Sequence, residues 1–228
     1  MFARLRHKTR WSASLLLAFA AGVVALAACG GSDDVEALRE QAESFTEVIT
    51  VGISMYLLVD DLENPDPAIS SKRSEEELKV ILAGMNEIWG QANIRLELET
   101  LDTIEVDPDV LARVAEGNIM AFFDKLGGRI PFTVAGPESS LISGFYTKRA
   151  GRANGISPLG TGWYMVIDEP SVFDHRVSSH EVGHILGLQH TGADRGRLLY
   201  SGTNGTTLTR EEITLTRYLA MEWLKAKR

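Results

Sequence analysis

Four stretches of the chain have the hydrophobic pattern of β-strands. Residues 48–59 form a nearly unbroken apolar run rich in β-branched side chains, which predicts a strand buried on both faces. Residues 94–99 alternate between aliphatic and charged side chains, which predicts a strand with one face in solvent. Two shorter apolar runs, 130–135 and 163–167, predict further strands.

Four other segments are typical of helices. A capping-box pattern at 74–77 opens the first long one, and a second capping box opens the segment 209–225 near the end of the chain. An Asp-Pro pair predicts the start of a helix over 107–127, because proline is favoured at the first helical position. A shorter helix is expected over 35–45. Apolar residues follow the first capping box at helical spacing and predict a buried face: Leu78, Ile81, Leu82, Met85, Ile88 and Trp89.

This mixture of strands and helices predicts one α+β or mixed α/β domain over residues 47–228. The glycine-rich stretch 144–162 leads to the strand at 163–167.

The first 28 residues have the organisation of a secretory signal peptide. They hold four basic residues and no acidic one, and they end in an apolar run, 15–28, that is short for a membrane span. The run leads into Leu26-Ala27-Ala28-Cys29, which resembles the lipobox of bacterial lipoproteins. The resemblance implies that Cys29 carries lipid, palmitate included, and is the first mature residue. It further implies that 29–46 is a lipidated tether, and that the protein is held by its lipid in the cell envelope, facing the periplasm or the exterior. The alternatives are a plain signal peptide or an uncleaved anchor helix with an incidental cysteine.

Charge and cysteine content narrow the remaining possibilities. The chain has 23 basic and 31 acidic residues, which gives a net charge of −8. All the charged residues among the first 28 are basic, so the rest of the chain is more acidic still. The acidity of the chain after residue 28 argues against nucleic acid as a partner, because phosphate backbones attract positive charge. With one cysteine in 228 residues, no intrachain disulfide can form.

An acidic, proline-marked loop over 60–67 is the first candidate for bound metal. Its carboxylates could suit calcium, but their spacing matches no calcium-loop motif, so solvated turn chemistry is the favoured interpretation.

The strongest chemical signal is the segment 180–190, which reads HEVGHILGLQH. On a helix, His180 and His184 lie one turn apart on the same face and can bind one metal ion. Gly187 can end that helix with a positive φ, so that the chain turns and His190 can supply a third nitrogen. Three imidazoles and an open fourth position describe a catalytic zinc site, and Glu181 can accept a proton from the water in that position. The bland alternative is a helix whose histidines are packed or exposed without metal.

This segment resembles the HExxHxxGxxH signature of the metzincin zinc peptidases, with a matrixin-like spacing. The resemblance implies a twisted, mostly parallel sheet with an antiparallel edge strand, an active-site helix and a C-terminal helix. It also implies a single catalytic Zn²⁺ and hydrolysis of peptide bonds. In that family an extended substrate adds to the edge strand above the cleft, which would place Asn154, Gly155 and Ile156 on the rim that binds substrate.

The chain departs from the family after the third histidine. Metzincins have a methionine in a turn below the zinc, and the corresponding residues here are Leu198 and Leu199. Leucine has a similar volume, so the turn can survive the change. The next residue, Tyr200, is either an extra zinc ligand or transition-state donor, as in some family members, or a wall of the specificity pocket.

Two functions fit these observations. The first is a zinc endopeptidase that acts on peptides or proteins, with Glu181 as the general base. The alternative is a non-catalytic zinc-containing envelope lipoprotein that binds a protein partner in its cleft. The sequence does not decide the substrate or the oligomeric state.

Overall fold

A computed structural model of the chain describes residues 32–126, 142–158 and 161–226. It separates into two units, Met1–Glu40 and Gln41–Arg228. The described part of the first unit is the beginning of helix α2 (Ser32–Ser44). The remaining described residues belong to the second unit.

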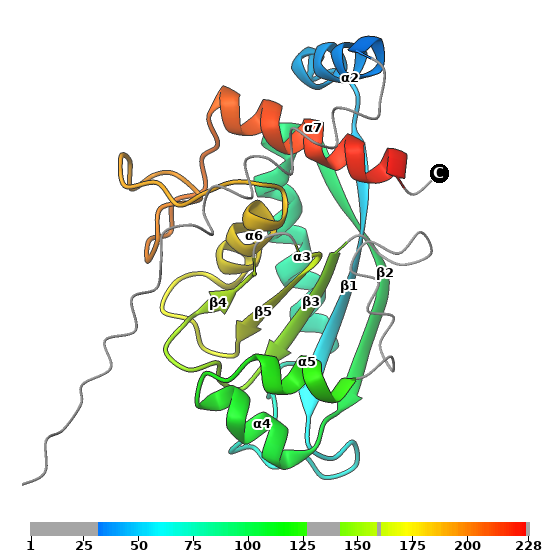
Figure 1. Cartoon of the computed structure of the whole chain (residues 1–228). Coiled ribbons are helices and arrows are strands. Elements are labelled where there is room, and N and C mark those ends of the chain that lie inside the picture. Colours follow the sequence, from blue (N-terminus) through cyan, green and yellow to red (C-terminus); the bar gives the residue numbers. More distant parts are fainter. Residues whose placement is uncertain (1–31, 127–141, 159–160, 227–228) are drawn as a thin grey trace, which may run out of the picture. The chain divides into compact units, whose positions relative to one another are not determined.

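A five-stranded sheet forms the centre of the second unit (Figure 1). Its strands lie in the order β2-β1-β3-β5-β4, and neighbours run parallel except for β4, which pairs antiparallel with β5 at one edge. The strands span these residues: β1 Ile49–Val59, β2 Ile94–Glu105, β3 Ile142–Thr147, β4 Gly155–Ile156 and β5 Trp163–Ile167. The predicted fold class, a mixed α/β domain with a mostly parallel sheet and an antiparallel edge strand, is confirmed.

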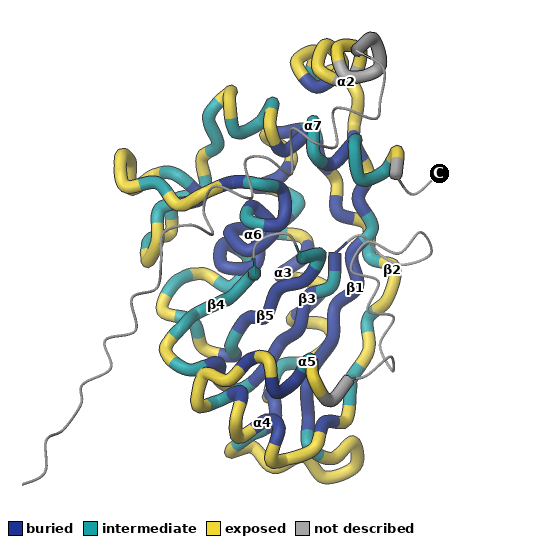
Figure 2. The backbone as a smooth tube through the Cα atoms, in the orientation of Figure 1, coloured by how far each residue is buried: buried dark blue, intermediate teal, exposed yellow. Residues whose placement is uncertain are grey.

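Helices cover both faces of this sheet. On one face, α3 (Glu75–Trp89) packs against β2 and against α6 (Asp174–Ile185), which in turn packs against β3 and β5. On the other face lie α4 (Pro108–Ala115) and α5 (Met120–Leu126), in front of the sheet in Figure 1. The strand β1 lies between the two layers and is almost wholly buried (Figure 2), as its unbroken apolar sequence predicts. A short 3-10 turn, Gly90–Ala92, and the last helix α7 (Arg210–Ala226) complete the elements.

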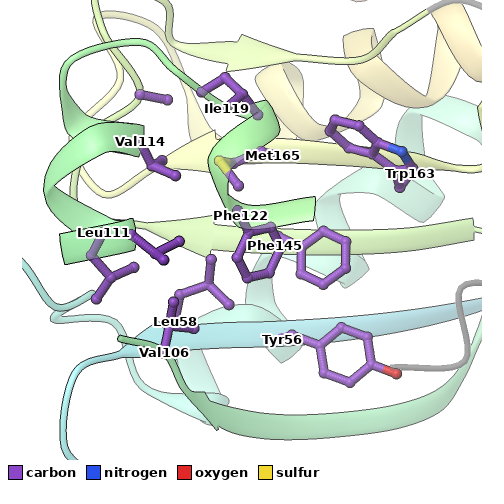
Figure 3. Close-up of a cluster of buried hydrophobic side chains, with 12 residues drawn as sticks. Tyr56, Leu58, Val106, Leu111, Val114, Ile119, Phe122, Phe145, Trp163 and Met165 are labelled. Atoms are coloured by element: carbon purple, nitrogen blue, oxygen red, sulfur yellow. The ribbon is translucent and has the colours of Figure 1, made fainter. Parts of the chain in front are cut away.

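The face below α4 and α5 is a continuous apolar core (Figure 3). Phe145 of β3 stacks on Tyr56 of β1, with ring centroids 5.4 Å apart. Phe122 of α5 meets the edge of Phe145 at 5.1 Å, a favoured geometry for aromatic pairs. Trp163 and Met165 of β5 close the same cluster.

The helix-start signals in the sequence are confirmed at three places. Ser74 accepts from the amide of Glu77, whose side chain bonds back to the amide of Ser74, so the capping box that opens α3 is complete. Thr209 and Glu212 bond reciprocally in the same way before α7. The Asp107 side chain caps α4, whose first residue is proline.

One secondary-structure prediction is wrong, and one strand was missed. The single helix expected over 107–127 is two helices, because the chain takes a positive φ of 100° at Gly117 and turns before α5 begins. The start of the stretch 144–162 carries no strand signal in the sequence, yet it belongs to β3, the middle strand of the sheet, whereas β4, Gly155–Ile156, lies within the expected rim. Gly144 hides the strand pattern, yet its missing side chain makes room for Tyr164, whose ring a β-carbon there would meet at 2.4 Å.

Several predictions fall outside the described residues. They are the signal peptide, Cys29 with the first part of the tether, and the strand expected at 130–135. Among the described residues, no helix combines the length and hydrophobicity that crossing a membrane requires.

Candidate metal centre

Helix α6 presents the first two histidines and the glutamate of the motif. The helix packs against α3 and β5, and Arg176 through Val182 are buried in this contact. His180 and His184, one turn apart, have ring centroids 4.8 Å apart. Glu181 is also buried, with 5% of its surface exposed. The sequence prediction that these residues share a helix is therefore confirmed.

Gly187 ends the helix and redirects the chain. Its φ is +85°, and the amides of Gly187 and Leu188 donate to the carbonyls of His184 and Gly183 at 3.0 and 2.8 Å. These two bonds form a Schellman motif, the usual glycine-dependent end of a helix. A β-carbon at Gly187 would also lie 2.4 Å from Leu219 of α7, so both the backbone conformation and the available space require glycine.

The turn brings His190 to the other two histidines. Its Nε2 lies 3.0 Å from Nε2 of His180 and 3.1 Å from Nε2 of His184. One ligand atom from each of the three rings lies within 4.8 Å of the others. After His190 the chain is held by the amide of Thr191, which donates to the carbonyl of Leu199 at 3.1 Å.

Hydrogen bonds behind the rings fix which nitrogen can bind a metal. Nδ1 of His180 lies 2.8 Å from the carbonyl oxygen of Leu198, and Nδ1 of His184 lies 2.9 Å from that of Leu188. A carbonyl can only accept, so both Nδ1 atoms carry hydrogen and both Nε2 atoms carry a lone pair. These two lone pairs face Nε2 of His190. That nitrogen can carry one hydrogen, which can be donated to His180 or to His184. A cation at the centre would satisfy all three nitrogens.

This set of donors fits zinc. Zn²⁺ takes histidine nitrogen in sites that leave one position open, and metal-binding histidines usually donate their other N–H to a carbonyl or carboxylate. Without a cation, burial lowers the pKa of His180 to about 3 and also lowers the pKa of His184. Both rings are thus neutral near pH 7, which metal binding requires.

Glu181 lies against the edge strand β4. A β-carbon on Gly155 would lie 2.7 Å from Oε1 of Glu181 and 2.8 Å from Val177, so glycine lets this strand approach the carboxyl group. Burial raises the pKa of Glu181 to about 8 in the metal-free chain, and the positive charge of Arg176 opposes that increase. Of the three predicted rim residues, Gly155 therefore lies beside Glu181, whereas Ile156 packs against the apolar core. Contact of these residues with a substrate remains a prediction. Asn154 joins the rim to the loop before α6 through two bonds with Ser171, of 2.8 and 3.0 Å.

The two leucines expected to replace the methionine turn lie beneath α6. Leu198 and Leu199 are completely buried. Leu199 reaches the helix at Gly183, where a β-carbon would lie 3.1 Å from its Cδ2. Tyr200 is half-buried, and its ring lies 5.8 Å from the guanidinium carbon of Arg195. The three alternative roles of Tyr200, as zinc ligand, transition-state donor or pocket wall, remain predictions.

Sequence reasoning missed two groups of buried polar residues around the site. Arg176 precedes His180 by one helical turn and donates to main-chain carbonyls of the segment 198–205. Tyr146 bonds to both Tyr164 and Ser178, at 3.0 and 3.1 Å, and so links β3 and β5 to α6. The position of Arg176, four residues before a predicted metal ligand, could have indicated that it lies on the same side of the helix. No sequence pattern indicates that Tyr146 and Tyr164 are in contact.

The acidic loop at 60–67 has turn chemistry. Asp60 accepts from the amide of Asp66 at 2.8 Å, and Asp61 accepts from the amides of Glu63 and Asn64 at 2.8 and 3.0 Å. Among the described residues, the cluster of metal-binding groups is the one made by the three histidines.

Comparison with known proteins shows the fold alone. No protein-family model and no curated protein matches the chain. Among solved structures, the chain is similar to a protein in a chaperone–substrate complex, with 12% identity and a TM-score of 0.51 over 78% of this chain. It spans 35% of that protein's length. It also matches archaemetzincin from Methanopyrus kandleri with 14% identity and a TM-score of 0.46, over 77% of this chain and 96% of that one.

Proposed function

We propose that the protein is a zinc-dependent endopeptidase. The observation that carries the proposal is the convergence of three imidazole nitrogens beside a buried carboxyl group at a sheet edge. His180, His184 and His190 would hold the ion. When bound, zinc would lower the pKa of a water molecule and polarise a carbonyl group.

Glu181 supplies the proton chemistry in this proposal. Its carboxylate oxygen accepts a proton from the attacking water and then delivers that proton to the leaving amine. Glu181 thus acts first as a general base and then as a general acid. Burial keeps bulk water from competing for that proton, and Arg176 favours the charged form that accepts it.

The strand β4 supports the choice of a peptide as substrate. It is the last strand of the sheet and lies directly over Glu181. An extended peptide that adds to this edge would form main-chain hydrogen bonds and pass beside the carboxyl group. The same edge could hold a partner that is not cut, which is the alternative function of a binding protein.

One experiment separates these functions. The purified protein is analysed for zinc and incubated with a mixed peptide library, beside Glu181→Gln as the matched variant. A peptidase is expected to bind about one zinc per chain, and the variant should keep the metal while its turnover drops by roughly 10²–10⁴-fold. One zinc without cleavage in the wild type would favour the binding protein, and no zinc would overturn both.

We also propose that the protein is a lipid-anchored component of a bacterial cell envelope, on the strength of the lipobox-like sequence at 26–29. In a bacterial host, Cys29→Ala should lose metabolic labelling with palmitate and leave the membrane fraction. A variant that is still labelled and still sediments with membranes would contradict the proposal.

A further inference from the structure

Arg176 occupies a position that is unfavourable for a positive charge. It lies in the first turn of α6, where the helix dipole repels cations, and 3% of its surface is exposed. Burying a guanidinium costs free energy unless its N–H groups are bonded. Among the described residues its bonds go to main-chain carbonyls and not to a carboxylate.

Those carbonyls belong to the segment that follows the metal motif. Nη2 of Arg176 donates to the carbonyl of Leu198 at 2.6 Å and to that of Tyr200 at 2.5 Å. Its Nε donates to the carbonyl of Gly205 at 3.3 Å. A single side chain thus holds both ends of the turn at 198–200.

The carbonyl of Leu198 receives a second donor. Nδ1 of His180 lies 2.8 Å from the same oxygen that Arg176 contacts. This bond sets the tautomer and the rotation of the His180 ring, and so the direction of its Nε2 lone pair. Leu198 and Leu199 have apolar side chains that can form no hydrogen bonds of their own, so the position of that oxygen depends on bonds to the main chain of the turn, such as those from Arg176 and His180.

We propose that Arg176 is a positioning residue of the metal centre. It acts through the carbonyl of Leu198, which it holds in the place where His180 must donate for its Nε2 to face the other two rings. The inference rests on the proposed zinc site but goes beyond it, because it assigns metal affinity to a residue that does not touch the metal.

A purely structural role would have a different signature, and Arg217 provides the matched control. Arg217 is completely buried in α7 and also donates to three main-chain carbonyls, those of Ala42, Glu47 and Ala92. Replacing it removes the same chemical group from a place where, among the described residues, its hydrogen bonds go neither to α6 nor to the turn at 198–200. Its loss should therefore lower the free energy of unfolding and leave zinc affinity unchanged.

The test compares Arg176→Met, Arg176→Lys and Arg217→Met in the full chain. Zinc affinity is measured by competition with a chromophoric chelator, the ligand geometry by the visible absorption of the Co²⁺-substituted protein, and stability by thermal melting without metal. We expect Arg176→Met to weaken zinc binding by about 10–100-fold and to change the cobalt spectrum. Lysine keeps the charge and reaches one carbonyl, so Arg176→Lys should recover part of the affinity. It also serves as the test if the methionine variant does not fold.

Two outcomes would overturn the inference. One is wild-type zinc affinity in folded Arg176→Met or, if that variant does not fold, in Arg176→Lys. The other is an equal loss of affinity in Arg217→Met, which would trace the effect to general destabilisation. A wild-type protein that binds no zinc would overturn the proposed function itself, so the two failures are distinguishable.

Discussion

The two faces of the sheet bury different kinds of side chain. The face under α4 and α5 is an apolar and aromatic core, in which side chains such as Phe122 and Phe145 fill the space without polar contacts. The face under α6 buries hydroxyl, guanidinium, imidazole and carboxyl groups, and Tyr146, Arg176 and His180 each make hydrogen bonds there. The first face supplies hydrophobic stabilisation, which has no direction, and the second supplies the directions that a metal site requires.

The strand β5 shows how closely the two faces are joined. Met165 points into the apolar core, whereas its neighbour Tyr164 points to the opposite face and bonds to Tyr146. Because side chains alternate along a strand, Met165 contributes to the apolar core while its neighbour Tyr164 contributes to the geometry of the site. Substitutions on the two faces should therefore have separable effects.

The largest effect on stability is expected from Phe122→Ala. The side chain is completely buried against Phe123 and Phe145, so its removal leaves a cavity and should lower the free energy of unfolding by about 3–5 kcal/mol. Zinc stoichiometry should remain as in the wild type, as measured by metal analysis of the folded fraction. Phe173→Ala is the control, because Phe173 is 59% exposed and its loss should cost well under about 1 kcal/mol. Loss of zinc from folded Phe122→Ala would refute the separation of the two faces.

A second prediction concerns pH and the polar face. In the metal-free chain the pKa of Glu181 is raised from 4.5 to about 8 by burial, so the folded state keeps a proton that the unfolded state releases. The stability from this neutral carboxyl is fully present below about pH 4.5 and is lost as the pH rises through 8. Urea unfolding with a chelator should show wild-type stability falling relative to Glu181→Gln in this window, by up to about 1.4 kcal/mol per pH unit. Taking the difference cancels the histidine titrations.

Zinc provides the control for that measurement. A bound dication favours the carboxylate form of a neighbouring glutamate, so adding zinc should remove the pH dependence of the difference. Parallel stability curves for the two metal-free proteins would show that Glu181 is ionised in the folded state.

The smallest effect is expected from Tyr146→Phe. The variant loses the hydroxyl that bonds to Tyr164 and Ser178, and the buried partners left behind should make the cost about 1–2 kcal/mol in chemical unfolding. Tyr56→Phe removes a hydroxyl from the apolar face, where it bonds to no described residue, and should change stability by less than about 0.5 kcal/mol. Equal costs in the two variants would mean that the polar network contributes nothing specific.

The sequence alone determined the local parts of this protein. The spacing of His180, Glu181 and His184, the glycine at 187 and the capping boxes before α3 and α7 all follow from rules that act over a few residues. The strand β1 was equally readable, because burial on both faces leaves a continuous apolar run. The break at Gly117 was missed, since glycine inside an apolar periodicity signals a turn only weakly.

Long-range packing sets which distant groups meet. The carbonyl of Leu198 lies behind His180, Gly155 lies over Glu181, and Arg176 joins the start of α6 to the turn at 198–200. β3 is likewise recognisable through its neighbours, because the gap at Gly144 is filled by a ring from β5. Helical and strand periodicities encode which side of an element is buried, but not what it is buried against. That choice depends on long-range packing, which brings together residues that no local pattern pairs.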